Sequence, residues 1–195
     1  MLEASPRILV LYGSSRPQSA SRKLAFNAMR ALAARGVEAR AYDPAALLRA
    51  SGEEGYAHDP RLYELAAWSD GQVWCSPEHH ASLSGVMKLV LDTLPPEATR
   101  GKALALMQIS GGAICCNALN DMSRIARALG MYTTTRQVAV GNVAHAFDAS
   151  DRLASAILRQ RLDEAMEEVT ALSRMLRERA AGAGGAANLS RVARA

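Results

Sequence analysis

Hydrophobic and polar positions divide this chain into two kinds of segment. Short continuous apolar runs bounded by turn residues predict strands that are buried on both faces, and longer segments with apolar residues at helical spacing predict helices. The strands are expected at 7–12, 37–43, 71–76, 102–110 and 131–140, and the helices at 22–36, 61–69, 85–94, 117–130 and 151–179. Strand and helix alternate five times, which predicts an α/β fold with a parallel sheet covered by helices on both faces.

The predicted sheet is doubly wound, and in such sheets a ligand binds beyond the carboxyl ends of the strands, where the strand order switches. In the five-stranded order 2-1-3-4-5, the first, third and fourth strands are neighbours. The loops that follow these three strands are GSSRPQSASR (13–22), SPEHHASLSG (76–85) and SGGAICCN (110–117). All three are rich in polar groups, so we expect them to meet at one site.

Composition limits the class of protein. With 195 residues, 49% of them hydrophobic and 22% charged, the chain is expected to form one soluble domain over residues 1–180. The Gly/Ala-rich tail, 181–195, is expected to be flexible or to contact another subunit. No apolar run reaches the roughly 18 residues of a membrane span and the start has no signal-peptide pattern, so we expect a cytoplasmic protein without a membrane partner.

The net charge of +4 comes mainly from dispersed arginines. Only 5% of the residues are aromatic and no DNA-reading helix motif is present, so a nucleic-acid partner is not expected. A basic face also attracts anionic cofactors and substrates.

The first loop concentrates hydroxyl and guanidinium groups before a helix. A helix N-terminus favours an anion, serine hydroxyls add donors, and arginines pair with phosphate oxygens. Neither a G-x-G-x-x-G fingerprint nor a G-K-[ST] loop is present, so the pattern indicates a monophosphate rather than a dinucleotide or a triphosphate. The alternative is a serine helix cap with solvent-exposed arginines.

The first loop resembles the G-S-x-R-x-x-S-x-S-R loop of the NADPH-dependent FMN reductases. The segments VWCSPEHHASLSGVMKLVLD and MQISGGAICCNALN are similar to the arsenic-resistance (ArsH) branch of that family. The resemblance implies a flavodoxin-like fold, bound FMN, reduction of the flavin by NADPH and a homotetramer. At the expected substrate side the chain departs from the ArsH pattern, at Ala20, Thr93, Cys115 and Cys116.

Carried over residue by residue, the resemblance gives a set of cofactor-binding positions. It places Ser14, Arg16, Ser19, Ser21 and Arg22 around the FMN phosphate; Pro77, Glu78, His79 and His80 along the flavin edge; and Ser110, Gly111 and Gly112 beside the ring. Glycines there let backbone N–H groups approach ring carbonyls, although an ordinary strand-to-helix turn explains them equally well.

The three cysteines are expected to be reduced, because they are odd in number and lack metal-ligand spacing. Cys115 and Cys116 have two interpretations: thiolates of lowered pKa near a helix N-terminus, serving redox chemistry or arsenical binding, or thiols that simply pack. Adjacent His79 and His80 have no third ligand nearby, so no metal is expected.

The favoured function is an enzyme that takes hydride from NADPH onto FMN and passes electrons to a small acceptor such as oxygen, a quinone, an azo compound or a trivalent organoarsenical. No general acid or base is named, because the flavin carries the chemistry. The alternative is a flavodoxin-type electron carrier, but such carriers are usually acidic and this chain is basic.

Overall fold

The structure is a computed structural model that describes residues 5–50 and 59–192. Its central sheet has the order β2-β1-β3-β5-β6, with β7 pairing β5 as well. The strands are β1 (Arg7–Tyr12), β2 (Glu38–Tyr42), β3 (Gly71–His79), β5 (Ala103–Ile109), β6 (Tyr132–Thr133) and β7 (Val138–Val140). All of them pair in parallel. The predicted order 2-1-3-4-5 is confirmed, with β5 as the predicted fourth strand and β6 and β7 as the predicted fifth. β4 (Ser82–Leu83) is only a short antiparallel addition to the end of β3.

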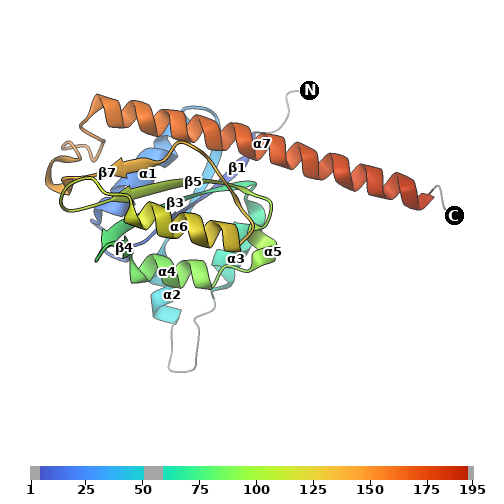
Figure 1. The fold of residues 1–195 in the computed structure, drawn as a ribbon, viewed down its shortest axis with the longest axis horizontal. Coiled ribbons are helices and arrows are strands. Elements are labelled where there is room, and N and C mark those ends of the chain that lie inside the picture. Colours follow the sequence, from blue (N-terminus) through green and yellow to red (C-terminus); the bar gives the residue numbers. More distant parts are fainter. Residues whose placement is uncertain (1–4, 51–58, 193–195) are drawn as a thin grey trace.

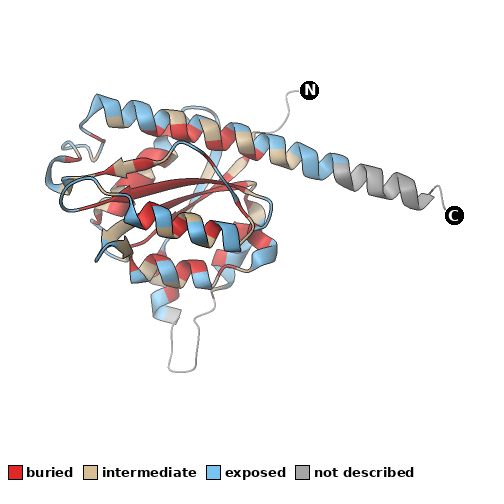
Figure 2. Ribbon diagram, in the orientation of Figure 1, coloured by how far each residue is buried: buried red, intermediate tan, exposed pale blue. Residues whose placement is uncertain are grey.

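Helices cover both faces of the sheet, as the alternating pattern predicts (Figure 1). α1 (Ala20–Ala33) and α7 (Ala156–Val192) pack on one face, where Leu24 and Met166 join the core of the sheet. α3 (Pro60–Trp68), α4 (Gly85–Asp92) and α6 (Asn117–Ala128) pack on the other face. β3 and β5 are buried along most of their length (Figure 2), which explains why their sequences are continuous apolar runs.

The fifth predicted strand, 131–140, is interrupted. Between β6 and β7 the backbone N–H groups of Thr135 and Arg136 each donate to the Glu168 carboxylate of α7, at 2.9 Å. These two N–H groups are therefore satisfied by a helix side chain instead of a neighbouring strand. A pattern of β-branched residues alone does not reveal this break.

Helix boundaries also differ from the sequence prediction. The region after β2 contains α2 (Pro44–Ala50), and α5 (Pro96–Thr99) follows the α4 segment. α7 begins at Ala156 rather than 151, with the Ser155 hydroxyl accepting from the backbone N–H of Leu158. It continues to Val192, so most of the predicted tail is helical, and its C-terminal half extends beyond the sheet (Figure 1). The last three residues, 193–195, lie outside the described residues.

Among the described residues, no helix combines the length and the apolar composition that a bilayer crossing requires.

Candidate functional site

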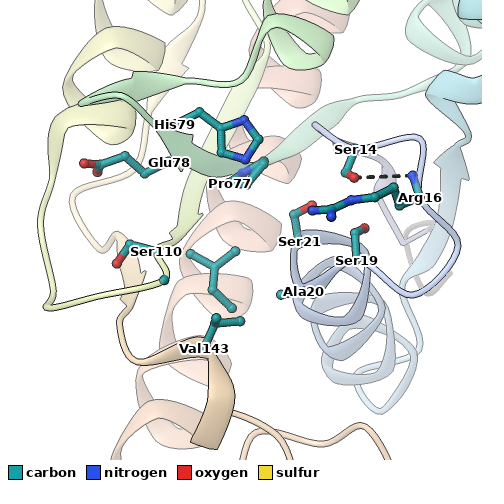
Figure 3. Close-up of a pocket in the computed structure, with 12 residues that line it drawn as sticks. Ser14, Arg16, Ser19, Ala20, Ser21, Pro77, Glu78, His79, Ser110 and Val143 are labelled. Carbon is teal, nitrogen blue, oxygen red and sulfur yellow. Dashed lines mark hydrogen bonds between the residues drawn. The ribbon is translucent and has the colours of Figure 1, made fainter.

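The three polar loops meet at a cavity of about 290 Å³ beyond the carboxyl ends of β1, β3 and β5. It is lined by Ser14, Arg16, Ser19, Ala20, Ser21, Pro77, Glu78, His79, Ile109, Ser110, Gly111 and Val143. In Figure 3, Arg16 and the first-loop serines Ser14, Ser19 and Ser21 lie on one side of the cavity. Pro77, Glu78, His79 and Ser110 lie on the other. The fold therefore brings together loops that whole strands and helices separate along the chain.

Nine of the twelve residues named from the sequence line this cavity. Arg22, His80 and Gly112 do not line it. Ala20, named from the sequence only as a departure on the expected substrate side, also lines the cavity, and sequence reasoning missed Ile109 and Val143. Val143 comes from the 3-10 turn Val143–His145 after β7, and the Asn142 N–H bond to the Gly112 carbonyl (2.7 Å) holds that turn beside the third loop. Nothing local in the sequence marks Val143 as a wall of the site.

The first loop is shaped by its own serines. Ser19 is the N-cap of α1 and accepts from the Arg22 backbone N–H at 3.3 Å, so the predicted serine cap is present. The Ser14 hydroxyl accepts from the Arg16 N–H at 3.3 Å. Ser21 behaves differently, because its buried Oγ has no hydrogen-bond partner among the described residues. A buried hydroxyl without a partner is costly, so Ser21 has a donor to offer to a ligand in the cavity.

Gly13, at the start of this loop, is required by the packing of the protein. A Cβ at this position would lie 2.6 Å from Ser84 Oγ and 2.8 Å from Met87 Cβ. Ser84 is the N-cap of α4 and also donates its hydroxyl to the Gly13 carbonyl at 2.7 Å. The glycine thus brings the first and second loops into contact beside the cavity.

The second loop is a tight hairpin between β3 and β4. His80 and Ala81 form its turn with positive φ angles of 50° and 60°, a conformation that is uncommon for residues other than glycine, asparagine and aspartate. His79 precedes the turn and lines the cavity, whereas His80 stands in the turn itself. The hairpin therefore places only the first of the two adjacent histidines at the cavity.

Glu78 is the centre of a hydrogen-bond cluster at the edge of the cavity. Its carboxylate accepts from Gln108 Nε2 at 2.9 Å, from the Cys115 thiol at 2.7 Å and from Asn117 Nδ2 at 3.1 Å. Gln108 is fully buried on β5 and also holds the α6 N-terminus by accepting from Leu119 N–H at 3.0 Å. Desolvation opposes ionisation of Glu78, but these donors outweigh it and lower the pKa of the carboxyl.

Cys115 donates its thiol hydrogen to the Glu78 carboxylate at 2.7 Å. Its hydrogen bond to the Glu78 carboxylate, reinforced by desolvation, raises the pKa of the thiol. The interpretation of a thiol with lowered pKa near a helix N-terminus is therefore wrong for Cys115, because the carboxylate opposes the effect of the helix. Cys75 is fully buried and donates to the Ser21 carbonyl at 3.2 Å, and burial raises its pKa as well.

These observations fit a bound FMN. The partnerless Ser21 hydroxyl and the Arg16 guanidinium are suited to a phosphate, and both line the same side of the cavity. A Cβ added at Gly111 or Gly112 would meet nothing within 4 Å, so the protein itself does not require glycine there. Open space beside these two backbones is what a closely approaching planar ring would use.

Comparison with known proteins agrees with this chemistry. The family model described as NADPH-dependent FMN reductase matches residues 6–145. The protein described as NADPH-dependent FMN reductase ArsH from Rhizobium meliloti is 38% identical over 179 residues, which is 89% of this chain and 74% of the relative. The ArsH protein of Acidithiobacillus ferrooxidans is 40% identical over 170 residues, 84% of this chain and 72% of that protein. An NADPH azoreductase from a Bacillus species is 40% identical over 63 residues, 32% of this chain and 35% of that protein.

Solved structures share the fold. An oxidoreductase from Corynebacterium diphtheriae superposes with a TM-score of 0.71 at 19% identity, covering 88% of this chain and 99% of that one. A flavodoxin from the domain Archaea has a TM-score of 0.63 at 11% identity, covering 86% and 99%. The sequence matches and the loops at the cavity lead to one conclusion: the chain belongs to the NADPH-dependent FMN reductase family, and FMN and NADPH are its cofactors.

Proposed function

We propose that this NADPH-dependent FMN reductase passes the electrons of its reduced flavin to a small electron acceptor, such as oxygen, a quinone or an azo compound. The flavin supplies the hydride and electron chemistry, and the protein binds and orients it. A trivalent organoarsenical loses electrons when it is oxidised, so it would act as an electron donor. We therefore do not propose it as an acceptor of the flavin's electrons.

The cofactor arrangement that we propose follows the two sides of the cavity. The phosphate lies beside Ser14, Arg16, Ser19 and Ser21, where hydroxyls, the α1 N-terminus and a guanidinium converge. The isoalloxazine ring lies between the Pro77–His79 segment and the Ser110–Gly111 turn. What supports this placement is the partnerless Ser21 hydroxyl on the first side and the open space at Gly111 on the second.

The phosphate placement is tested by Arg16→Ala. We expect FMN affinity to fall at least tenfold, because charge-assisted hydrogen bonds contribute roughly 1.5–3 kcal/mol. Arg61→Ala, an exposed arginine on α3, is the matched control and should leave FMN affinity unchanged. Titration by flavin fluorescence, with riboflavin alongside FMN, measures both. Equal loss of riboflavin affinity, or no loss at all, would contradict the placement.

One observation carries the proposal of a small acceptor: the third loop forms an open, partly apolar rim of the cavity. Gly111, Gly112 and Ala113 are exposed, and Ile114 is 64% exposed although it is a large apolar residue. Gly141 packs directly under it, where a Cβ would lie 2.8 Å from the Ile114 backbone nitrogen. Ile114 follows the cavity-lining residues Ser110 and Gly111 in this loop, and its exposed apolar side chain offers a contact surface to an apolar acceptor.

A variant at this rim tests the proposal. We expect Ile114→Ser to lower kcat/KM for a quinone about fivefold, equivalent to roughly 1 kcal/mol of lost apolar contact, with FMN affinity retained. Ile157→Ser, which changes a 79% exposed isoleucine on α7, is the control and should have no effect. The assay contains NADPH, the flavoprotein and the quinone under anaerobic conditions. If turnover required an added redox protein, the electron-carrier alternative would replace this proposal.

A further inference from the structure

A second cavity, of about 190 Å³, lies next to the first along the same loop and helix. Its walls are Pro17, Gln18, Arg22, Lys23, Phe26, Arg30 and Asp151. The two cavities share no residue, yet they are lined by chain neighbours: Arg16 and Ser21 line the first, and Pro17 and Arg22 line the second. The second cavity extends along α1 for about 12 Å, the axial rise between Arg22 and Arg30.

Positive charge dominates this second cavity. Lys23 forms an ion pair with the Asp151 carboxylate at 2.5 Å, so the charge of this lysine is neutralised by the carboxylate in the cavity wall. Arg22 and Arg30 form no ion pair among the described residues. Arg22 Nη1 donates to the Pro17 carbonyl at 3.0 Å, and Arg30 Nη1 donates to the Asp151 carbonyl at 3.4 Å. A carbonyl does not neutralise a guanidinium, so the walls carry two uncompensated positive charges.

The position of Arg22 is fixed by an aromatic ring. Its guanidinium carbon lies over Phe26 at 4.8 Å from the ring centroid, a cation–π geometry. This contact and the Pro17 hydrogen bond direct Arg22 into the second cavity and away from the first, where the family resemblance expected it. The chain thus divides its two loop arginines, with Arg16 at the cofactor cavity and Arg22 at the second one.

Two guanidiniums, an aromatic ring and a small volume suit a phosphate attached to a nucleoside. Planar guanidiniums form paired hydrogen bonds with phosphate oxygens, and a phosphate monoester carries close to two negative charges at neutral pH. We propose that this cavity binds the 2′-phosphate on the adenosine ribose of NADPH, the group that distinguishes NADPH from NADH. An arginine near the ribose serves this purpose in other NADP-binding folds. The inference rests on NADPH being the hydride donor.

The test uses the FMN-loaded protein and ligands that report binding without turnover. We expect adenosine 2′,5′-bisphosphate to bind at least tenfold more tightly than adenosine 5′-monophosphate by calorimetry. Arg30→Ala should remove most of that difference and leave the affinity for the monophosphate unchanged. Arg61→Ala, on the opposite face of the sheet, is the matched control and should keep the difference intact.

Steady-state kinetics provide the second readout. In Arg30→Ala the KM for NADPH should rise about tenfold at unchanged kcat, and the KM for NADH should stay the same. Equal affinity for the two adenosine phosphates in the unmodified protein would overturn the inference. So would an Arg22→Ala variant that loses FMN affinity while it keeps its preference for the bisphosphate, because Arg22 would then serve the FMN phosphate. Neither result affects the acceptor assay, whose readout is the dependence of turnover on the quinone.

Discussion

At the scale of single residues, the Glu78 cluster decides the chemistry of the third loop. A carboxylate that accepts from a thiol favours the protonated form of that thiol, and the thiol in turn favours the ionised form of the carboxylate. The pKa of Cys115 is therefore raised by Glu78, and the pKa of Glu78 is lowered by donors that include Cys115. Cys115 thus acts as a hydrogen-bond donor at the edge of the cofactor cavity.

This arrangement predicts the reactivity of the thiol. Alkylation of Cys115 should show a pH midpoint above the ordinary thiol pKa of about 8.5, because the thiolate is the reactive form. In Glu78→Gln the midpoint should move down toward that ordinary value, since the neutral amide no longer opposes ionisation. Mass spectrometry of protein labelled with iodoacetamide between pH 6 and 10 measures the rate. A midpoint at or below 8.5 in the unmodified protein would refute the assignment.

The same pair has a consequence for stability. The pKa of Cys115 is higher in the folded than in the unfolded protein, so its contribution is fully present below the unfolded pKa and is lost as the pH rises through the folded pKa. Glu78 has the opposite sign: its folded pKa is lowered, so its contribution is present above the unfolded pKa and is lost as the pH falls. At neutral pH both residues therefore contribute to stability, because Glu78 loses its contribution at acidic pH and Cys115 loses its contribution at alkaline pH.

At the scale of elements, α7 supports the interrupted edge of the sheet. Glu168 accepts from the backbone N–H groups of Thr135 and Arg136 and from the Thr135 hydroxyl at 2.7 Å. Arg136 also forms an ion pair with Glu164, one turn earlier on the same helix. The break between β6 and β7 is therefore stabilised by a helix that is distant in the sequence.

Removing this support should cost stability. We expect Glu168→Ala to lower the free energy of unfolding by about 1–2 kcal/mol at pH 7, because two backbone donors lose their partner. Glu167→Ala, an exposed neighbour on the same helix, is the control and should change it by less than about 0.5 kcal/mol. Urea denaturation followed by circular dichroism gives both values.

The pH dependence of this effect has a definite sign. Desolvation of Glu168 raises its pKa, but hydrogen bonds from Thr135 and Arg136 outweigh it, so the folded pKa is lowered. Its stabilising contribution is therefore present above the unfolded pKa of about 4.3 and is lost as the pH falls through the folded value. The difference between Glu168→Ala and the unmodified protein should shrink in this acidic range. A difference that stayed constant down to pH 3 would contradict the role of the carboxylate.

At the scale of the whole molecule, α7 is longer than the sheet requires. Among the helix residues whose burial the structure describes, 156–182, the last buried one is Ser173, but the helix continues to Val192, roughly 28 Å further at 1.5 Å per residue. Met175 is 57% exposed on this extension. Because α7 extends beyond the sheet (Figure 1) and helices in proteins are stabilised mainly by packing, we propose that residues 181–195 contact a neighbouring subunit in a homotetramer.

Light scattering tests this assembly directly. The full chain should have the mass of four copies at micromolar concentration, and a chain that ends at Ala181 should shift toward smaller species. FMN affinity of the shortened chain should be retained, since no cavity-lining residue lies beyond Asp151 in either of the two cavities described above. A monomeric full chain would refute the tetramer, and an unchanged mass after shortening would refute the role of the tail.

The sequence by itself determined the features that depend on near neighbours in the chain. The continuous apolar runs of β1, β3 and β5 predicted a parallel sheet, and five alternations with helices predicted the doubly wound order. The dense hydroxyls of residues 14–21 predicted a polar wall of the cavity, because a loop and the helix that it caps are one local unit. These sequence patterns arise from residues that are close together in the chain, so they can be recognised without knowledge of the fold.

Only the tertiary structure decided what lies beside those features. Glu78 meets Cys115 from 37 residues away, Val143 enters the cavity from a turn after β7, and Glu168 reaches the sheet from α7. Arg22 points away from the cofactor cavity because Phe26 and Pro17 hold it, which a loop motif cannot indicate. Side-chain direction and pKa depend on long-range packing, so the sequence predicted the position of the site and the tertiary structure determined its chemistry.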